Sequence, residues 1–248
     1  MYITINNQNI YYQKLGQGKD LIMLHGWKQD VSTFHNVAEE LKKHFTLWLI
    51  DLPGFGRSEN PKSDFMVDDY AKIILDFIKE NKITKPNLLG HSLGGRIGIK
   101  LAANHPDLLS KLVLESSAGI KHEHDFLRLI SFASAKVFNY LIPDLGNFKK
   151  IIKHKFYKQV GSDYEDAKEL KATFINIINE DLTSDLTKIS TPVLVIGGQK
   201  DTSVPPRDQR IMYRKIKFSK LEILINVAHF PHLENPNKFM YFVKDFLN

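Results

Sequence analysis

The chain has 248 residues, a formal net charge of +6 and no cysteine. This length accommodates one α/β domain with an insertion, and the lack of cysteine excludes disulfides, thiolate metal sites and a cysteine nucleophile. The positive charge comes mostly from lysines spread along the chain, without a nucleic-acid-binding motif, so we expect no nucleic-acid partner. No apolar run is long enough to cross a membrane and the first residues lack an apolar signal-peptide core, so the expected location is cytoplasmic.

The N-terminal part of the chain alternates between strand and helix patterns. Residues 2–6 and 9–14 flank an asparagine-rich turn and predict a β-hairpin. Continuous apolar runs at 21–24 and 46–50 predict strands that are buried on both faces. Apolar residues at helical spacing predict a helix over 33–43, between those two strands.

The same alternation continues on both sides of a middle section. The further predicted elements are a helix at 66–80, a strand ending near Gly90, a helix ending near Asn104, a strand at 112–114, a strand at 192–196, a helix at 207–216, a strand at 221–225 and a helix at 236–247. Strands that alternate with helices indicate an α/β fold: a mostly parallel, eight-stranded sheet with helices on both faces. In such sheets the ligand site lies beyond the carboxyl ends of the strands.

The middle section, residues 119–187, breaks this alternation. It holds several helical patterns, including an aromatic and aliphatic stripe over 126–142, and no strand pattern. We expect it to form an inserted helical lid, with residues 1–118 and 188–248 forming the core domain. The stripe is expected to pack on that core rather than to insert stably into a membrane.

The segment Gly90-His91-Ser92-Leu93-Gly94-Gly95 joins a predicted strand to a predicted helix. The pattern Gly-x-Ser-x-Gly at such a junction is typical of a nucleophile elbow, a sharp turn that projects the serine hydroxyl above the sheet. Ser92 is therefore the predicted nucleophile. The backbone N–H groups of Leu93, at the helix N-terminus, and of Trp27, after an earlier strand, are predicted to form an oxyanion hole.

A serine nucleophile needs a base, and the base needs a group that fixes its orientation and charge. His229 follows the last predicted strand and is the predicted base, with His232 as the alternative. Asp201 follows the preceding strand and is the predicted acid, with Glu115 as the alternative. The chain order serine, acid, histidine is the one expected of an elbow serine.

Several other residues also stand just past predicted strand ends, so we expect them to gather with these in one crevice. They are His25-Gly26-Trp27, the loop Asp51 to Ser58 and Glu115.

Taken together, these motifs resemble the α/β-hydrolase superfamily, specifically its lid-bearing group of small bacterial esterases and related hydrolases. The resemblance covers nearly the whole chain outside the middle section and rests on His25-Gly26, Asp51-Leu52-Pro53-Gly54-Phe55-Gly56-Arg57-Ser58, Gly90 to Gly95, Gly198 to Asp201 and His229 to Pro236. It implies a serine hydrolase that cleaves small to medium carboxylic esters through an acyl-enzyme and needs no cofactor. It also implies that the Asp51 to Ser58 loop braces the site and takes no part in the chemistry. Ala228 stands where many relatives have glycine before the catalytic histidine.

Other activities remain open on the same scaffold. Carbon-carbon bond hydrolases of ring-cleavage products and lactonases use a similar triad, but the former commonly have Asn and Trp where this chain has His91 and Phe230. The alternative outside the enzymes is a non-catalytic ligand receptor. The pattern His122-Glu123-His124-Asp125 resembles a metal-binding sequence, but Phe126 replaces its next histidine, so we expect no metal. The chain is expected to be a monomer or a homodimer.

Overall fold

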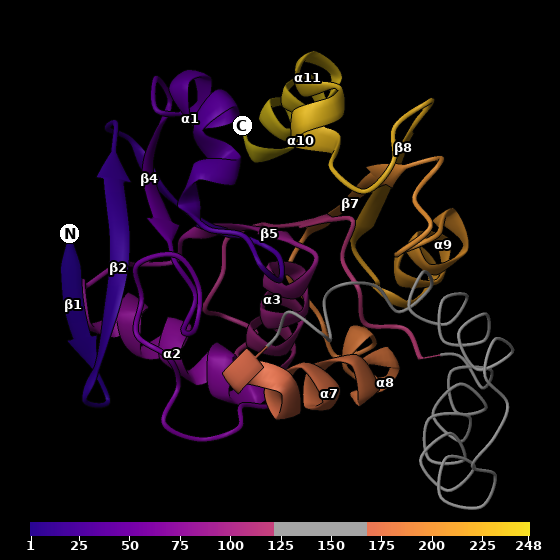
Figure 1. Ribbon diagram of the computed structural model, residues 1–248. Helices are drawn as coiled ribbons and strands as arrows, with labels where there is room; N and C mark the ends of the chain where they lie inside the picture. Colours follow the sequence, from indigo (N-terminus) through magenta and orange to yellow (C-terminus); the bar gives the residue numbers. More distant parts are fainter. Residues whose placement is uncertain (122–167) are drawn as a thin grey trace, which may run out of the picture.

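An eight-stranded sheet organises the part of the chain that the computed structural model describes, residues 1–121 and 168–248 (Figure 1). The strand order is β1-β2-β4-β3-β5-β6-β7-β8. The strands are β1 (Tyr2–Ile5), β2 (Gln8–Leu15), β3 (Lys19–Leu24), β4 (Phe45–Ile50), β5 (Asn87–His91), β6 (Leu112–Glu115), β7 (Val193–Gly198) and β8 (Ser219–Leu224). Strand β2 is antiparallel to β1 and β4, and all other neighbours are parallel. The predicted α/β fold class is confirmed.

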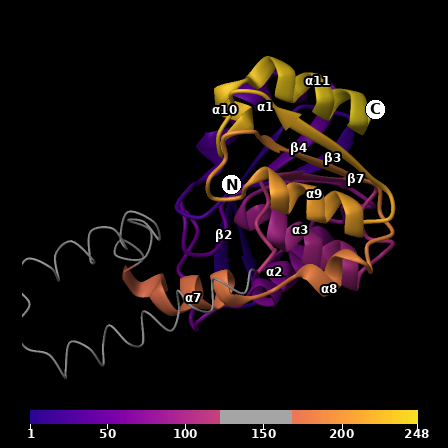
Figure 2. The same ribbon diagram turned by 90° about the vertical axis from the view of Figure 1, so that its right-hand side faces the viewer.

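Helices cover both faces of the sheet (Figures 1 and 2). On one face lie η1 (Val31–Phe34), α1 (His35–Leu41), α10 (Pro231–Glu234) and α11 (Pro236–Leu247); on the other lie α2 (Val67–Glu80), α3 (Leu93–Asn104), α8 (Thr183–Leu186) and α9 (Pro206–Lys215), with η2 (Lys168–Leu170) and α7 (Lys171–Asn179) beyond them. Successive side chains of a strand point to opposite faces. Accordingly, Leu21 and Met23 of β3 pack under α1 and α11, whereas Ile22 and Leu24 pack under α2 and α3.

Most predicted elements coincide with observed ones to within a few residues, and the differences are local. The predicted helix at 33–43 is divided into η1 and α1. Strand β8 begins two residues before the predicted strand at 221–225 and ends one residue before its end, so Ile225 lies beyond it and is 63% exposed. The short helix α10 was not predicted.

The predicted lid is described only at its two ends. The expected helical stripe at 126–142 and the His122 to Asp125 pattern lie outside the described residues. Helix α7 confirms the helical pattern near the end of the middle section. Within the described ranges, no helix is both long enough and apolar enough to span a membrane.

Candidate active site

The turn between β5 and α3 holds Ser92 in an unusual backbone conformation, with φ 50° and ψ −104°. This turn is tight because a Cβ at Gly90 would lie 2.3 Å from the carbonyl oxygen of Gly94, and a Cβ at Gly94 would lie 2.1 Å from that of Leu24. Only glycine fits at either position. The sequence Gly-x-Ser-x-Gly therefore produces a strained turn that exposes the serine at the end of the strand.

Replacing Ser92 with glycine is expected to stabilise the protein by about 1 kcal/mol, because glycine adopts this positive φ without strain. For a chain of this size, the melting temperature should rise by about 2–4 °C. Thermal unfolding of Ser92→Gly and Ser92→Ala checks this, since alanine keeps the Cβ and hence the strain. Equal melting temperatures for the two variants would show that the elbow stores no strain.

The two amides predicted for the oxyanion hole follow neighbouring, in-register strands. Leu24 of β3 is paired with Gly90 of β5, and Trp27 and Leu93 each lie three residues beyond this pair. The two loops are joined by a hydrogen bond from Gly94 N–H to the carbonyl of His25, 3.2 Å long. Trp27 and Leu93 both line the same cavity as Ser92. This arrangement is suited to two N–H donors that converge on one oxygen.

His229 and Asp201 are hydrogen-bonded, with 2.8 Å between His229 Nδ1 and Asp201 Oδ2. The other carboxylate oxygen, Oδ1, accepts the backbone N–H groups of Ser203 and Val204 at 2.9 and 2.8 Å. These two bonds fix the buried carboxylate, so Oδ2 is directed at the imidazole. A proton on Nδ1 leaves Nε2 as a hydrogen-bond acceptor, which is the tautomer a general base requires.

The loop that carries His229 is held on both sides by Glu234. Its carboxylate accepts the backbone N–H of Ala228 at 2.7 Å and that of Phe230 at 2.9 Å. The loop also packs tightly on the end of β7, where a Cβ at Gly198 would lie 2.0 Å from the carbonyl oxygen of Ala228. Glu234 therefore positions the two chain neighbours of His229.

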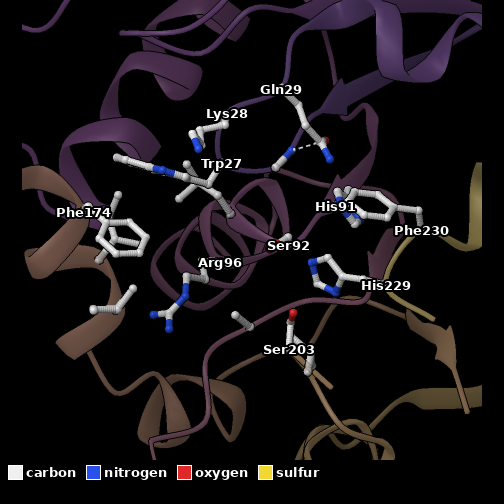
Figure 3. A pocket seen from close by; sticks show the side chains of 16 residues that line it. Trp27, Lys28, Gln29, His91, Ser92, Arg96, Phe174, Ser203, His229 and Phe230 are labelled. Atoms are coloured by element: carbon white, nitrogen blue, oxygen red, sulfur yellow. Dashed lines mark hydrogen bonds between the residues drawn. The ribbon is translucent and has the colours of Figure 1, made fainter. Parts of the chain in front are cut away.

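Ser92 and His229 line one cavity of about 640 Å³, shown in Figure 3. Its described walls are formed by Gly26, Trp27, Lys28, Gln29, His91, Ser92, Leu93, Arg96, Ala118, Phe174, Ile177, Ile178, Ser203, Val204, His229 and Phe230. The ring of Trp27 packs 4.9 Å from Phe55 and 5.0 Å from Phe174, measured between centroids. Helix α7 thus contributes an apolar wall opposite the histidine.

Some residues expected in the crevice are buried behind it and do not line the cavity. His25 Nδ1 lies 2.7 Å from the Gly26 carbonyl oxygen, and Nε2 accepts the N–H of Leu52 at 3.0 Å. Burial lowers the pKa of His25, which fits a neutral ring with its proton on Nδ1. Asp51 accepts the backbone N–H groups of Val31 and Arg57. Both side chains therefore brace the loops around the site.

The alternative acid and the alternative base are paired with each other. Glu115 Oε1 accepts the backbone N–H of His232 at 2.9 Å and lies 2.7 Å from His232 Nδ1. His232 Nε2 lies 3.0 Å from Thr33 Oγ1. Both Glu115 and His232 are fully buried, so His232 does not lie at the pocket rim. Neither residue substitutes for Asp201 or His229 in the observed pair.

His91 lies between these two histidine-acid pairs. Its ring centroid is 5.0 Å from that of His229 and 5.3 Å from that of His232. Among the residues that the structure describes, neither of its nitrogens has a hydrogen-bond partner, and neither has Glu115 Oε2, which lies 3.9 Å from His91 Nδ1. His91, Glu115 and His232 present ligand atoms within 4.8 Å of one another. The hydrogen bond between His232 Nδ1 and Glu115 occupies that nitrogen, so Glu115 and His232 form a hydrogen-bonded pair beside the His91 ring.

Stability is expected to fall as the pH drops below about 6.5, because burial and neighbouring histidines hold the pKa of His91 well below its ordinary value. The unfolded chain takes up a proton that the folded protein does not. The free energy of unfolding then falls with a slope approaching about 1.4 kcal/mol per pH unit for this histidine. His91→Asn should show a shallower fall in melting temperature between pH 7 and pH 5. An identical pH profile for the variant would contradict this role of His91.

Comparisons with known proteins agree with this geometry. A family model described as the alpha/beta hydrolase fold matches residues 20–149. A pimeloyl-acyl-carrier-protein methyl ester esterase of Aeromonas salmonicida is 27% identical over 96% of this chain and 99% of its own length. Among solved structures, an enol-lactonase from Burkholderia xenovorans LB400 has a TM-score of 0.79 at 22% identity, covering 100% of this chain and 99% of that one.

A meta-cleavage product hydrolase from Pseudomonas fluorescens IP01 has a TM-score of 0.76 at 17% identity and covers 100% of this chain and 97% of its own. At these identities the two solved structures indicate the fold alone. The family model spans more than half of the chain and includes Trp27 and the turn that carries Ser92. The chain belongs to the α/β-hydrolase family.

Proposed function

We propose that the chain is a serine hydrolase of small to medium carboxylic esters, with Ser92, His229 and Asp201 as its catalytic triad. The observation that carries the proposal is the 2.8 Å hydrogen bond between His229 and Asp201, located at the cavity that Ser92 also lines. Curated relatives that align along nearly the full chain are methyl ester esterases, which supports a carboxylic ester hydrolase.

The proposed reaction uses only side chains and backbone groups of this chain. Ser92 Oγ attacks the ester carbonyl while His229 Nε2 takes its proton, and Asp201 stabilises the resulting imidazolium. The tetrahedral oxyanion accepts hydrogen bonds from Trp27 N–H and Leu93 N–H. His229 returns the proton to the leaving alcohol as the C–O bond breaks. Water then attacks the acyl-enzyme by the same steps and releases the acid.

The cavity supports an apolar acyl group of moderate size. Its volume of about 640 Å³ is within the range typical of small-molecule sites. Trp27, Phe174 and Ile177 supply apolar surface. Because the curated relatives act on a methyl ester of a pimeloyl group, methyl esters of medium-chain acids are the first substrates to assay.

We also infer that residues 119–187 form a lid over the core formed by residues 1–118 and 188–248. Helix α7 supports this, since Phe174, Ile177 and Ile178 form one wall of the cavity. A cytoplasmic location, the absence of any required cofactor or metal, and a monomeric or homodimeric state are proposed on the sequence alone.

The test is hydrolysis of p-nitrophenyl and methyl esters of increasing acyl length by the wild type and by Ser92→Ala. We expect a maximum at short to medium chains in the wild type and loss of turnover in the variant. Ring-cleavage dienoates and enol-lactones, assayed in parallel, test the alternative activities. Saturable binding of these compounds without turnover by the wild type would favour the receptor and contradict the proposal.

A further inference from the structure

Arg96 is placed one helical turn beyond Ser92, on the same face of α3. Its backbone N–H donates to the carbonyl of Ser92 at 3.2 Å, so the two Cα atoms are about 6 Å apart along the helix. The side chain lines the cavity. In Figure 3 its guanidinium points away from His229, toward the side where Phe174 lies.

No described carboxylate forms an ion pair with Arg96, although Glu180 and Asp181 lie near enough to raise its pKa and partly offset the effect of burial. Its one described side-chain hydrogen bond runs from Nη1 to the backbone carbonyl of Glu180, 3.0 Å long. The Glu180 carboxylate is instead 2.8 Å from Lys100 Nζ. The Asp181 carboxylate accepts from the hydroxyl and the backbone N–H of Thr183. The nearby acids are therefore committed to other partners.

The guanidinium is desolvated and yet still has donors that face the cavity. Arg96 is 6% exposed, and burial lowers its pKa to about 10, so it stays protonated at neutral pH. Because the side chain lines the cavity, its guanidinium is within reach of a ligand bound there. A buried arginine of this kind binds carboxylates with good geometry and strength.

The proposed mechanism determines which part of a bound ester would lie next to Arg96. The leaving alcohol must lie near His229 Nε2, which returns the proton to it. The acyl chain then extends to the other side of Ser92, where the guanidinium and Phe174 lie.

We propose that Arg96 is a specificity-determining residue that binds a carboxylate at the far end of the acyl group, so that half-esters of dicarboxylic acids are preferred substrates. This inference rests on the proposed function and deepens it. Phe174 and Ile177 would contact the methylene chain between the ester and the carboxylate. The chain length of the best substrate then reports the distance between Ser92 and the guanidinium.

The experiment compares each monomethyl half-ester, from succinate to suberate, with the methyl ester of the monocarboxylic acid of equal length. The readout is the ratio of their kcat/KM values on the same enzyme preparation, which a loss of folded protein does not change. In Arg96→Met, which keeps the apolar stem, the ratio is expected to fall about 10- to 100-fold at the preferred length, through KM. Arg96→Lys should keep part of the preference, because it keeps the charge.

Arg210→Met is the matched control, since it makes the same chemical change. Arg210 is exposed on α9 and does not line the cavity. Its loss should leave the ratio unchanged. An equal fall of the ratio in this control, or an unchanged ratio in Arg96→Met, would overturn the inference while leaving the ester hydrolase intact.

The wild type supplies a test that needs no folded variant. At the preferred length it should show a lower KM for the half-ester than for the neutral ester. A lower KM for the neutral ester at every length overturns the inference alone. No hydrolysis of any ester overturns the proposed function and the inference with it.

Discussion

Replacing Asp201 with asparagine is expected to lower kcat by about 10⁴-fold while the protein stays folded. Asparagine can keep its oxygen on the backbone N–H groups of Ser203 and Val204, where Asp201 Oδ1 now accepts. Its NH₂ group would then face His229 Nδ1 and act as a donor. The imidazole would be forced into the tautomer with its proton on Nε2, and it could not accept the proton of Ser92.

Steady-state hydrolysis of a p-nitrophenyl ester, together with thermal unfolding, measures this effect. The exposed Asp64 offers a matched control, since Asp64→Asn makes the same chemical change away from the cavity. Its kcat should equal that of the wild type. A value for Asp201→Asn within tenfold of the wild type would mean that His229 does not act as the base oriented by Asp201.

Replacing His232 with phenylalanine is expected to cost about 1–3 kcal/mol of stability, because it removes the imidazole that bonds the fully buried Glu115 side chain and leaves only the backbone N–H of residue 232 on that oxygen. The ring itself has aromatic neighbours in Phe34 and Phe239, at centroid distances of 5.0 and 6.1 Å, so phenylalanine fits the shape of the site. The loss therefore reports the electrostatics rather than the packing. The melting temperature should fall by about 2–12 °C.

The double variant His232→Phe/Glu115→Met separates the loss of the pairing between the two side chains from any loss of packing. Removing both members of a buried pair is often nearly neutral, so the double variant should be more stable than His232→Phe alone. Chemical denaturation measures the free energies of unfolding of His232→Phe, of Glu115→Met and of the double variant. If the double variant loses the sum of the two single effects, the two side chains are not coupled, and the account of Glu115 and His232 as a pair is wrong.

Much of the fold could be predicted from local patterns. Strands β3 and β4 are continuous apolar runs because helices cover the sheet on both faces, and such runs could be placed from the sequence. Asn6 and Asn7 both adopt positive φ, 50° and 58°, as their residue type in a two-residue hairpin turn predicts. The end of β8 was misplaced because β8 is an edge strand whose side chains are only partly buried, so its apolar pattern carries less information.

The candidate site could be predicted only in part, and the reason differs from the one that applies to the fold. Ser92, Asp201 and His229 each follow a strand, and parallel strands bring such positions to one edge of the sheet. The pairing of Glu115 with His232 joins residues 117 positions apart, and no local pattern says which of two acids meets which of two histidines. Only the structure separates the two pairs.

Two further residues of the site were missed altogether. Arg96 did carry a signal, because it lies four residues after Ser92 and so on the same helical face. Glu234 holds the loop of His229 by accepting two backbone N–H groups, and no sequence pattern indicates such hydrogen bonds.

The most direct test of the account is covalent labelling with a fluorophosphonate probe, followed by mass spectrometry of the intact protein and of its peptides. The account predicts that the wild type gains one probe adduct, that the adduct maps to Ser92, and that folded Ser92→Ala gains none. A label on any other residue, or equal labelling of Ser92→Ala, would contradict the assignment of Ser92 as the nucleophile.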